Sequence, residues 1–308
     1  MEFSDDELVV ASWNVPHNGL PSGGKGDNRP AKSKVIARYV PRPHVFFRQE
    51  LKGAHEDGRA ELYREAREDM GGLHPIASRP QEGRSQKPVG VMVHQKMFEL
   101  THEFEHVLQW KTIINPRVRL KVPPSLAPAR MAGTAMKAVN LASAHLCHFD
   151  PDSRATEARR LTTLADHGRS AIIGMDANSY PHSEQEAHTL PDWDKVEDRV
   201  HYQHRTIERD GRRVSDSRPD EILSGGPRPV FVDVALHAGV LTPTASLWRT
   251  DQGPRQRIDR IYITPDLVPA LRRVEVVDTD EVKAASDHAL VIAVFGLPEL
   301  VRALTPAA

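Results

Sequence analysis

The chain has 308 residues, 39% of them hydrophobic, and a formal net charge of −1 with its 16 histidines counted as neutral. No apolar run approaches the ~20 residues that a membrane span needs, and the acidic start lacks a secretory signal, so we expect a cytoplasmic protein that does not bind membranes. Cys147 is the only cysteine, which excludes an internal disulfide and a cysteine-based zinc cage. The charge balance neither favours nor excludes nucleic acid as a partner.

The first part of the chain alternates short apolar runs with breaks rich in glycine and proline. Such runs predict buried strands, and they fall at residues 8–13, 45–47, 73–78, 89–94 and 138–146. Helical patterns cover residues 31–40, which two prolines follow, and residues 54–70, which two glycines follow. The proline-rich residues 116–128 are predicted to be a loop.

The rest of the chain begins with a helical pattern over residues 153–167, whose alanine and leucine side chains fall on one face. Strands rich in valine and isoleucine are then expected at residues 171–175, 230–235, 258–263, 274–277 and 289–295. Residues 180–229 are polar with little periodicity, which indicates a loop insertion. Many short strands with few helices predict one layered α/β domain over residues 1–308.

Polar side chains recur where these strands end. They are Asn14, Glu50, His145, Asp176, Asn178, Asp259, Asp287 and His288. A carboxylate that caps or interrupts an apolar strand is costly unless a partner compensates its charge. Several such groups are less costly together when they share a hard cation, and oxygen ligands of this kind suit Mg²⁺.

Six short motifs carry these residues in a fixed order. They are Ala11-Ser12-Trp13-Asn14, Arg48-Gln49-Glu50, Ser143-Ala144-His145, Gly174-Met175-Asp176-Ala177-Asn178, Arg257-Ile258-Asp259-Arg260-Ile261 and Ser286-Asp287-His288. In this order the chain resembles the endonuclease/exonuclease/phosphatase (deoxyribonuclease-I-like) superfamily from Ser12 to Phe295. Each motif alone is weak, but six in order at strand ends are a specific signal.

The resemblance implies a four-layer α-β-β-α sandwich, in which two packed, mostly antiparallel sheets are flanked by helices. It also implies a phosphoesterase that uses Mg²⁺ or Mn²⁺, with nucleic-acid phosphodiesters as the first substrate class. A small phosphorylated molecule or a phospholipid headgroup is the alternative, because the fold does not choose among them. No obligate protein partner is inferred.

The resemblance also implies roles for the strand-end residues. The expected metal ligands are Asn14, Glu50 and Asp287. The expected catalytic residues are His145, Asp176, Asn178, Asp259 and His288. Asp176 and Asn178 resemble a pair that orients the attacking water, and Asp259 resembles a carboxylate that orients its histidine, His288. His145 resembles a phosphate contact or a proton donor to the leaving group, and the proton acceptor is either Asp176 or His288.

Two features depart from the family pattern. The usual Gly-Asp-Phe-Asn is one residue longer here, although the spacing from Asp176 to Asn178 is retained. Ser143-Ala144-His145 replaces the tyrosine-containing motif of the abasic-site repair branch, which favours the deoxyribonuclease or phosphatase branches.

Ordinary structural roles remain open for single residues. Asn14 can cap a turn, Glu50 can face solvent, Asp259 can pair with a neighbouring arginine, and Asp287 can form a turn with Ser286. These explanations must hold for all six motifs at once, which favours the functional interpretation.

A zinc-protease motif offers a distant alternative function. His102-Glu103-Phe104-Glu105-His106 has the required spacing, but both histidines reach one ion only on a helix. The surrounding apolar residues alternate with polar ones, which predicts a strand. On a strand, residues four apart lie ~13 Å from each other, too far to share one Zn²⁺.

Overall fold

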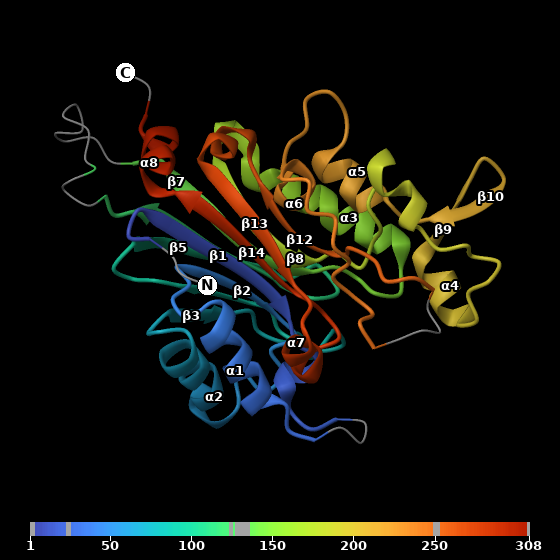
Figure 1. Cartoon of the computed structure of the whole chain (residues 1–308), viewed down its shortest axis with the longest axis horizontal. Helices are drawn as coiled ribbons and strands as arrows, with labels where there is room; N and C mark the ends of the chain where they lie inside the picture. Colours follow the sequence, from blue (N-terminus) through green and yellow to red (C-terminus); the bar gives the residue numbers. More distant parts are fainter. Residues whose placement is uncertain (1–3, 23–25, 123–125, 127–135, 249–252, 307–308) are drawn as a thin grey trace.

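The computed structural model describes residues 4–22, 26–122, 126, 136–248 and 253–306. It contains two six-stranded sheets (Figure 1). The first has the order β13 (Leu271–Val277), β14 (Leu290–Gly296), β1 (Glu7–Asn14), β2 (Val45–Gln49), β4 (Gly90–Val93) and β3 (His74–Ala77). The second has the order β11 (Val232–Asp233), β12 (Asp259–Ile263), β8 (Ser170–Asp176), β7 (Ala138–His145), β6 (Ile113–Leu120) and β5 (Phe98–His106). Neighbours are antiparallel except β1 with β2 and β7 with β8.

Three apolar clusters separate four layers. One lies between the sheets and joins residues such as Val10 and Phe47 to Leu141 and Ile261. A second packs the first sheet against α1 (Arg29–Tyr39), α2 (Ala60–Arg64) and α7 (Asp280–Ala285). A third packs the second sheet against α3 (Pro151–Thr162) and α5 (Arg218–Ser224). Since each sheet is covered on both faces, its central strands are buried along almost their whole length. The expected α-β-β-α sandwich is confirmed.

Short elements complete the chain. They are η1 (Pro16–Gly19), η2 (Asp57–Arg59), η3 (Glu65–Asp69), η6 (Thr163–Gly168), η7 (Glu184–Thr189), α4 (Arg199–Arg205), β9 (Thr206–Arg209), β10 (Arg212–Ser215), α6 (Val234–His237), η8 (Pro265–Ala270) and α8 (Leu297–Leu304). Residues 180–229 thus carry η7, α4, the β9–β10 hairpin and α5. This segment is therefore more ordered than its weak periodicity suggests.

The predicted loop over residues 116–128 is wrong where β6 continues to Leu120. Pro116 is accommodated at an irregularity, because β6 pairs with β7 through Ile114 and then resumes at Arg117. The Asn115 side chain donates to the Leu141 carbonyl at 2.9 Å, in the gap between these pairs. A proline is tolerated in a strand where the ladder is interrupted in this way.

The predicted strand over residues 230–235 is also wrong for most of its length. Only Val232 and Asp233 form β11, and α6 begins at Val234. The Asp233 carboxylate caps this helix, because it accepts hydrogen bonds from the backbone N–H groups of Ala235 and Leu236. This capping interaction overrides the preference of valine for strands.

The zinc-protease motif lies on β5, as the alternating pattern predicts. His102 stacks on Phe104, and His106 lies beside Arg160, 3.3 Å from its Nε. Because the two histidines are four residues apart on an extended strand, they do not share one ion. The protease alternative is therefore contradicted.

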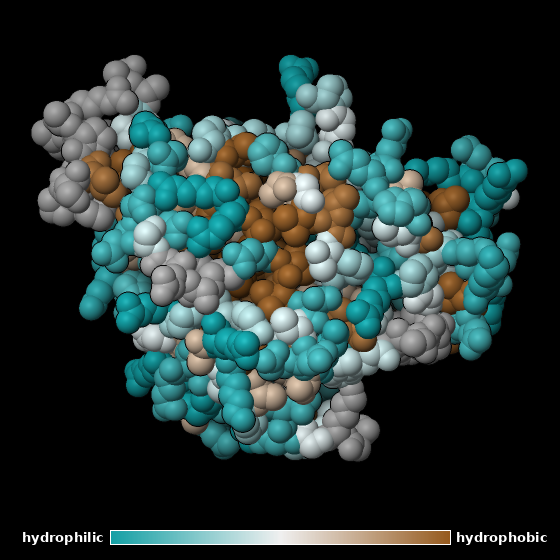
Figure 2. Space-filling view, viewed as in Figure 1, coloured by the Kyte–Doolittle hydropathy of each residue, from teal (hydrophilic) through white to brown (hydrophobic). Residues whose placement is uncertain are grey.

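In the described residues, no helix is both long and apolar enough to cross a bilayer. Apolar side chains do gather over β13, β14 and α6, with polar residues around them (Figure 2). Val268, Leu271 and Val276 are partly buried residues of this region that pack on the cluster between the sheets. The patch marks the edge of the sandwich at which β13 and β11 end their sheets.

The half-buried His44, which directly precedes β2, makes stability depend on pH. The Val9 N–H donates to His44 Nδ1 at 3.0 Å, and burial together with the nearby His94 lowers the pKa of His44 to about 4. The unfolded chain binds a proton near pH 6.5, so His44 contributes stability above that pH and loses it as the pH falls towards 4. We predict a loss of up to about 3 kcal/mol from this group over that interval.

The measurement is urea unfolding of the wild type and of His44→Asn between pH 7 and pH 4. Asparagine can still accept the Val9 hydrogen bond but does not titrate. The variant should lose less stability across this interval than the wild type does. If the free energy of unfolding fell equally with pH in both proteins, His44 would not be the titrating group.

Candidate active site

Three neighbouring strands place a row of polar side chains at one end of the second sheet. His145 on β7 and Asp259 on β12 both pair in register with Asp176 on β8. All three residues are buried. Side chains at directly paired positions lie about 5 Å apart, so strand register alone brings these residues together.

Asp176 is the centre of the row. Its carboxylate lies 3.1 Å from His145 Nε2 and accepts hydrogen bonds of 2.9 Å from the Asn14 side chain and from the Asn178 N–H. Burial raises the pKa of this carboxyl, but His145, His288 and Lys111 outweigh burial and hold it well below its usual range. Asp176 is therefore an ionised carboxylate, fixed by residues from both sheets.

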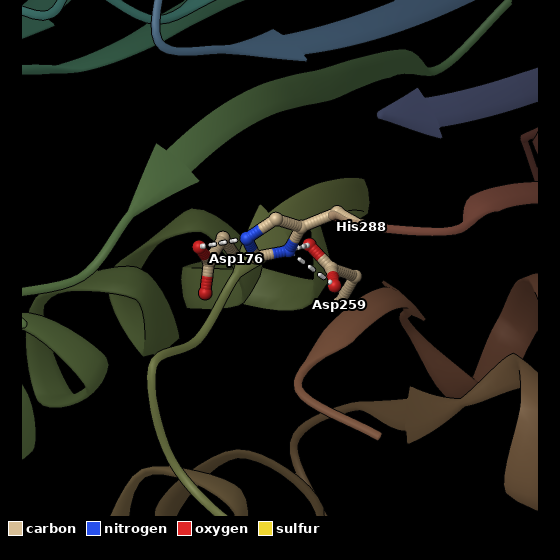
Figure 3. A group of neighbouring side chains, drawn as sticks. All are labelled: Asp176, Asp259 and His288. Atoms are coloured by element: carbon tan, nitrogen blue, oxygen red, sulfur yellow. Dashed lines mark hydrogen bonds and ion pairs between the residues drawn. The ribbon is translucent and has the colours of Figure 1, made fainter. Parts of the chain in front are cut away.

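His288 lies between two carboxylates (Figure 3). Its Nδ1 is 2.9 Å from Asp259 Oδ2, and its Nε2 is 4.0 Å from Asp176 Oδ2. Burial lowers the pKa of His288, but the carboxylates of Asp259, Asp287 and Asp176 together outweigh burial and raise it to about 10. The Asp259 contact also fixes the orientation of the imidazole ring and directs Nε2 towards Asp176.

Glu50 follows β2 in a strained conformation, with a φ of +59° that side chains other than glycine rarely adopt. Its carboxylate accepts hydrogen bonds from the His17 N–H at 3.0 Å and from Lys87 Nζ at 2.7 Å. Burial raises the pKa of Glu50, but His145, Lys87 and Lys111 outweigh burial and lower it to about 2. Such strain persists only where the surroundings enforce it, and it clusters at functional sites.

A cavity of about 490 Å³ is lined by most of the expected site residues. These are Asn14, Glu50, His145, Asp176, Asn178 and His288. Asp287 lines an adjoining recess together with Asn178 and His288, and Asp259 supports His288 from behind the cavity. The structure thus gathers all eight residues, although their sequence positions span almost the whole chain.

The donor atoms fit a hard cation. Asn14 Oδ1 and Asp287 Oδ1 are buried and have no hydrogen-bond partner among the residues that the structure describes. Separately, Asp176, Asp259 and His288 each offer one ligand atom within 4.8 Å of the others. Carboxylate and amide oxygens are the ligands that Mg²⁺ takes. The residues present therefore fit a divalent cation, which would compete with Lys87 for Glu50.

Two lysines in this cavity were not among the site residues predicted from the sequence. Lys87 pairs with Glu50, and Lys111 is buried at the start of β6. Burial lowers the pKa of Lys111 to about 8, which leaves it mostly cationic at neutral pH. Lys111 lies two residues before Ile113, where β6 begins, so a search for all charged residues near strand ends, rather than for acids and histidines, would have found it.

Arg205 is a third missed residue and belongs to the 180–229 segment. Its guanidinium donates to the Asn178 backbone carbonyl and, at 2.6 Å, to Asn178 Oδ1. Asn178 has a φ of +48°, and its Nδ2 donates to the Leu146 carbonyl at 2.9 Å. The segment therefore supports one of the expected catalytic side chains. No local pattern in the sequence marks this arginine among its neighbours.

Cross-sheet contacts set the distance between the two halves of the site. Gln49 Nε2 on β2 donates to Ser143 Oγ on β7 at 3.2 Å, and Ser143 Oγ donates to the Arg48 carbonyl at 3.0 Å. Beside them, Gly174 packs so closely on Phe47 that a Cβ would lie 2.3 Å from its ring. The glycine of the Gly174-to-Asn178 motif is thus required by sheet packing.

A buried ionic network stabilises the strand ends that precede Glu50 and carry Asn14. Glu65 pairs with Arg48 Nε at 2.6 Å and with Lys32, and all three side chains are fully buried. Arg48 also donates to the Trp13 carbonyl at 2.6 Å. The ends of β1 and β2 are therefore both linked, through Arg48, to the carboxylate of Glu65.

No known family model matches the sequence, and no curated protein matches it. Solved structures do match over almost the whole chain. D. rerio TDP2 complexed with a single-strand DNA product has a TM-score of 0.58 at 17% identity, covering 94% of this chain and 99% of its own. An endonuclease/exonuclease/phosphatase family protein from Bacteroides thetaiotaomicron has a TM-score of 0.59 at 16% identity, covering 94% and 96%. A mannosyl-6-phosphatase from the same organism has a TM-score of 0.57 at 14% identity, covering 93% and 98%. The chain therefore shares its fold with these structures, one of which is an endonuclease/exonuclease/phosphatase family protein.

The ionic network makes a prediction about stability. Replacing Glu65 with alanine leaves Arg48 and Lys32 buried without their carboxylate, and breaking a buried pair in this way costs about 3–5 kcal/mol. We expect Glu65→Ala to lower the free energy of unfolding in urea by this amount. Glu68→Ala is the control, because the Glu68 side chain is 71% exposed and should change stability little. Equal stability of the two variants would contradict the role of the network.

Proposed function

We propose that this chain is a divalent-metal-dependent phosphoesterase that cleaves nucleic-acid phosphodiesters by in-line attack of water. The observation that carries the proposal is the convergence of Glu50, Asp176 and His288, with Lys111, on one cavity between the ends of the two sheets. The structural similarity to TDP2 complexed with a single-strand DNA product supports nucleic acid as the substrate class.

Asn14, Glu50 and Asp287 would hold the cation, Mg²⁺ or Mn²⁺. They supply amide and carboxylate oxygens, and two of these oxygens lack hydrogen-bond partners within the described part of the chain. When bound, the cation offsets negative charge on the phosphate and eases departure of the leaving oxygen.

Asp176 is the proposed acceptor of the proton from the attacking water. It is ionised at neutral pH, whereas the pKa of His288 is raised and leaves that imidazole protonated. Asn178 lies beside Asp176 and is held there by Arg205, so it can orient the water and contact the phosphate. A base held in position beside its water contributes typically 10²- to 10⁴-fold to the rate.

His145 and His288 take different roles in this proposal. Burial is the main cause that lowers the pKa of His145 to about 4, and a neutral ring donating to Asp176 orients that carboxylate. This favours a positioning role over proton donation to the leaving group. His288 and Lys111 supply positive charge where the phosphate would lie, which stabilises charge that develops during displacement.

A phosphatase of a small phosphorylated molecule is the second candidate. The net charge of −1 lacks the basic excess typical of duplex-binding proteins, and one structural neighbour is a mannosyl-6-phosphatase. A panel of single-stranded DNA, duplex DNA, RNA and sugar phosphates separates the two. Turnover of sugar phosphates alone would reject the nuclease proposal.

Asp176, the proposed base, and the neighbouring His288 should both be needed for catalysis. Asp176→Asn and His288→Ala should each lower Mg²⁺-dependent cleavage of single-stranded DNA by at least about 100-fold, because each removes a charged group from the reacting region. His102→Ala is the control, since His102 lies on exposed β5 and should retain full activity. Circular dichroism would verify that each variant is folded. Near-wild-type turnover of either site variant would reject the assignment.

The second functional prediction concerns the cation. A chelator should abolish activity, and added Mg²⁺ or Mn²⁺ should restore it. Glu50→Gln should raise the Mg²⁺ concentration for half-maximal activity by about 10- to 100-fold, because a charged ligand is lost. Glu56→Gln, which removes an exposed carboxylate nearby, should leave this concentration unchanged. Full activity of the wild type in excess chelator would contradict metal dependence.

A further inference from the structure

A second, larger groove lies beside the proposed active site. It has a volume of about 900 Å³ and runs between the turn after β5 and the loop that leads from β7 into α3. Trp110 lines both this groove and the catalytic cavity, so the two spaces adjoin. No residue of the catalytic set proposed above lines the groove, which leaves its role unassigned.

Aromatic rings meet where the groove joins the cavity. Trp110 and Phe149 pack edge to face, with ring centroids 5.0 Å apart and planes at 89°. His148, which lines the catalytic cavity, packs against Phe149 at 5.2 Å. Phe149 is 38% exposed, so part of its ring is open to solvent. The junction thus offers exposed ring faces next to the reacting groups.

A buried carboxylate fixes this aromatic pair. Glu157 on α3 accepts hydrogen bonds from the backbone N–H of Trp110 at 3.0 Å and from the backbone N–H of Cys147 at 2.7 Å. One side chain therefore ties the turn that carries Trp110 to the loop that carries Phe149. Because these side chains are already fixed, a preorganised surface of this kind loses less conformational entropy when a ligand binds.

Two residues of the groove wall, Gln109 and Trp110, each carry a side-chain polar atom that is not used within the described part of the protein. Trp110 Nε1 and Gln109 Oε1 are buried and lack a hydrogen-bond partner among the described residues. Each of the four acidic groups in the lining has a partner. Asp150 caps α3, and Asp152 pairs with Arg218 at 2.8 Å. Glu105 accepts from the Arg79 backbone N–H at 2.6 Å, and Glu157 accepts from the two backbone N–H groups described above. Exposed arginines, including Arg159 and Arg160, add positive charge to the same wall.

We propose that this groove binds the nucleobase next to the scissile phosphate, with the base stacked on one ring of the perpendicular Phe149–Trp110 pair and in edge contact with the other. The inference rests on the proposed nuclease function and extends it to single-stranded substrates, whose bases are free to stack. Aromatic faces accept any base, so binding should tolerate differences in sequence.

The experiment compares two substrates that differ only in their bases. One is a thymidine trinucleotide, and the other has the same backbone with tetrahydrofuran in place of each nucleoside sugar and base. The readout is the ratio of kcat/KM for the two. Stacking predicts a ratio of about ten or more for the wild type, and a ratio near one for Phe149→Ala and Trp110→Ala.

Phe104→Ala is the matched control. Phe104 is 37% exposed, like Phe149, but lies on β5 outside the groove, so its removal should preserve the ratio. A wild-type ratio near one would overturn the inference. Equal effects of Phe104→Ala and Phe149→Ala would overturn it as well.

Calorimetry of both trinucleotides with Asp176→Asn separates this inference from the proposed function. Tighter binding of the base-bearing strand, by about tenfold, supports the groove whether or not the wild type cleaves DNA. Equal affinities overturn the groove even where cleavage is observed, whereas absence of cleavage alone rejects the nuclease function. Loss of phosphatidylcholine vesicle binding by Phe149→Ala, with trinucleotide binding intact, would assign the exposed rings to lipid and overturn the inference.

Discussion

A buried carboxylate has to be compensated, and Asp176 is the group on which this constraint acts. Its charge lies at the end of an apolar strand, where an unpaired ion would cost several kcal/mol. Asn14 reaches it from the first sheet, His145 from the neighbouring strand, and His288 from the start of β14. The charge of Asp176 is compensated only if the strands of both sheets end next to each other. This arrangement also brings the proposed catalytic groups together.

Contacts with surrounding residues stabilise two site residues whose backbone conformations are strained. Glu50 and Asn178 keep left-handed backbone conformations, and each has a cationic side chain on it, Lys87 on Glu50 and Arg205 on Asn178. Beneath them, Glu65 neutralises Arg48 and fixes the ends of β1 and β2. Positive charge around the ionised carboxylates is what a phosphate substrate requires, so the groups that stabilise the fold also prepare the site for an anion.

Strand ends were predictable because valine and isoleucine runs end abruptly in charged residues. That pattern predicted a layered α/β domain and marked the eight side chains that the structure gathers. The four-layer sandwich came from the resemblance of six motifs to a known superfamily. Other features depend on contacts that no local pattern encodes. Pro116 fits into β6 only because Asn115 bridges to β7, and Val234 turns helical because Asp233 caps α6. Arg205 and Lys87 reach the site from polar stretches in which many similar residues face solvent. Their partners, Asn178 and Glu50, lie far away in the sequence.

The central claim is that these side chains converge to bind a divalent cation next to a phosphate. The most direct measurement is a crystal structure of the protein soaked with Mn²⁺ and a non-hydrolysable phosphodiester, with the metal located by its anomalous scattering. The account predicts one strong anomalous peak within about 2.5 Å of oxygen atoms of Glu50 and Asp287, with the phosphate beside Asp176 and His288. Absence of metal from this cavity, or a peak at His102 and His106 instead, would contradict it.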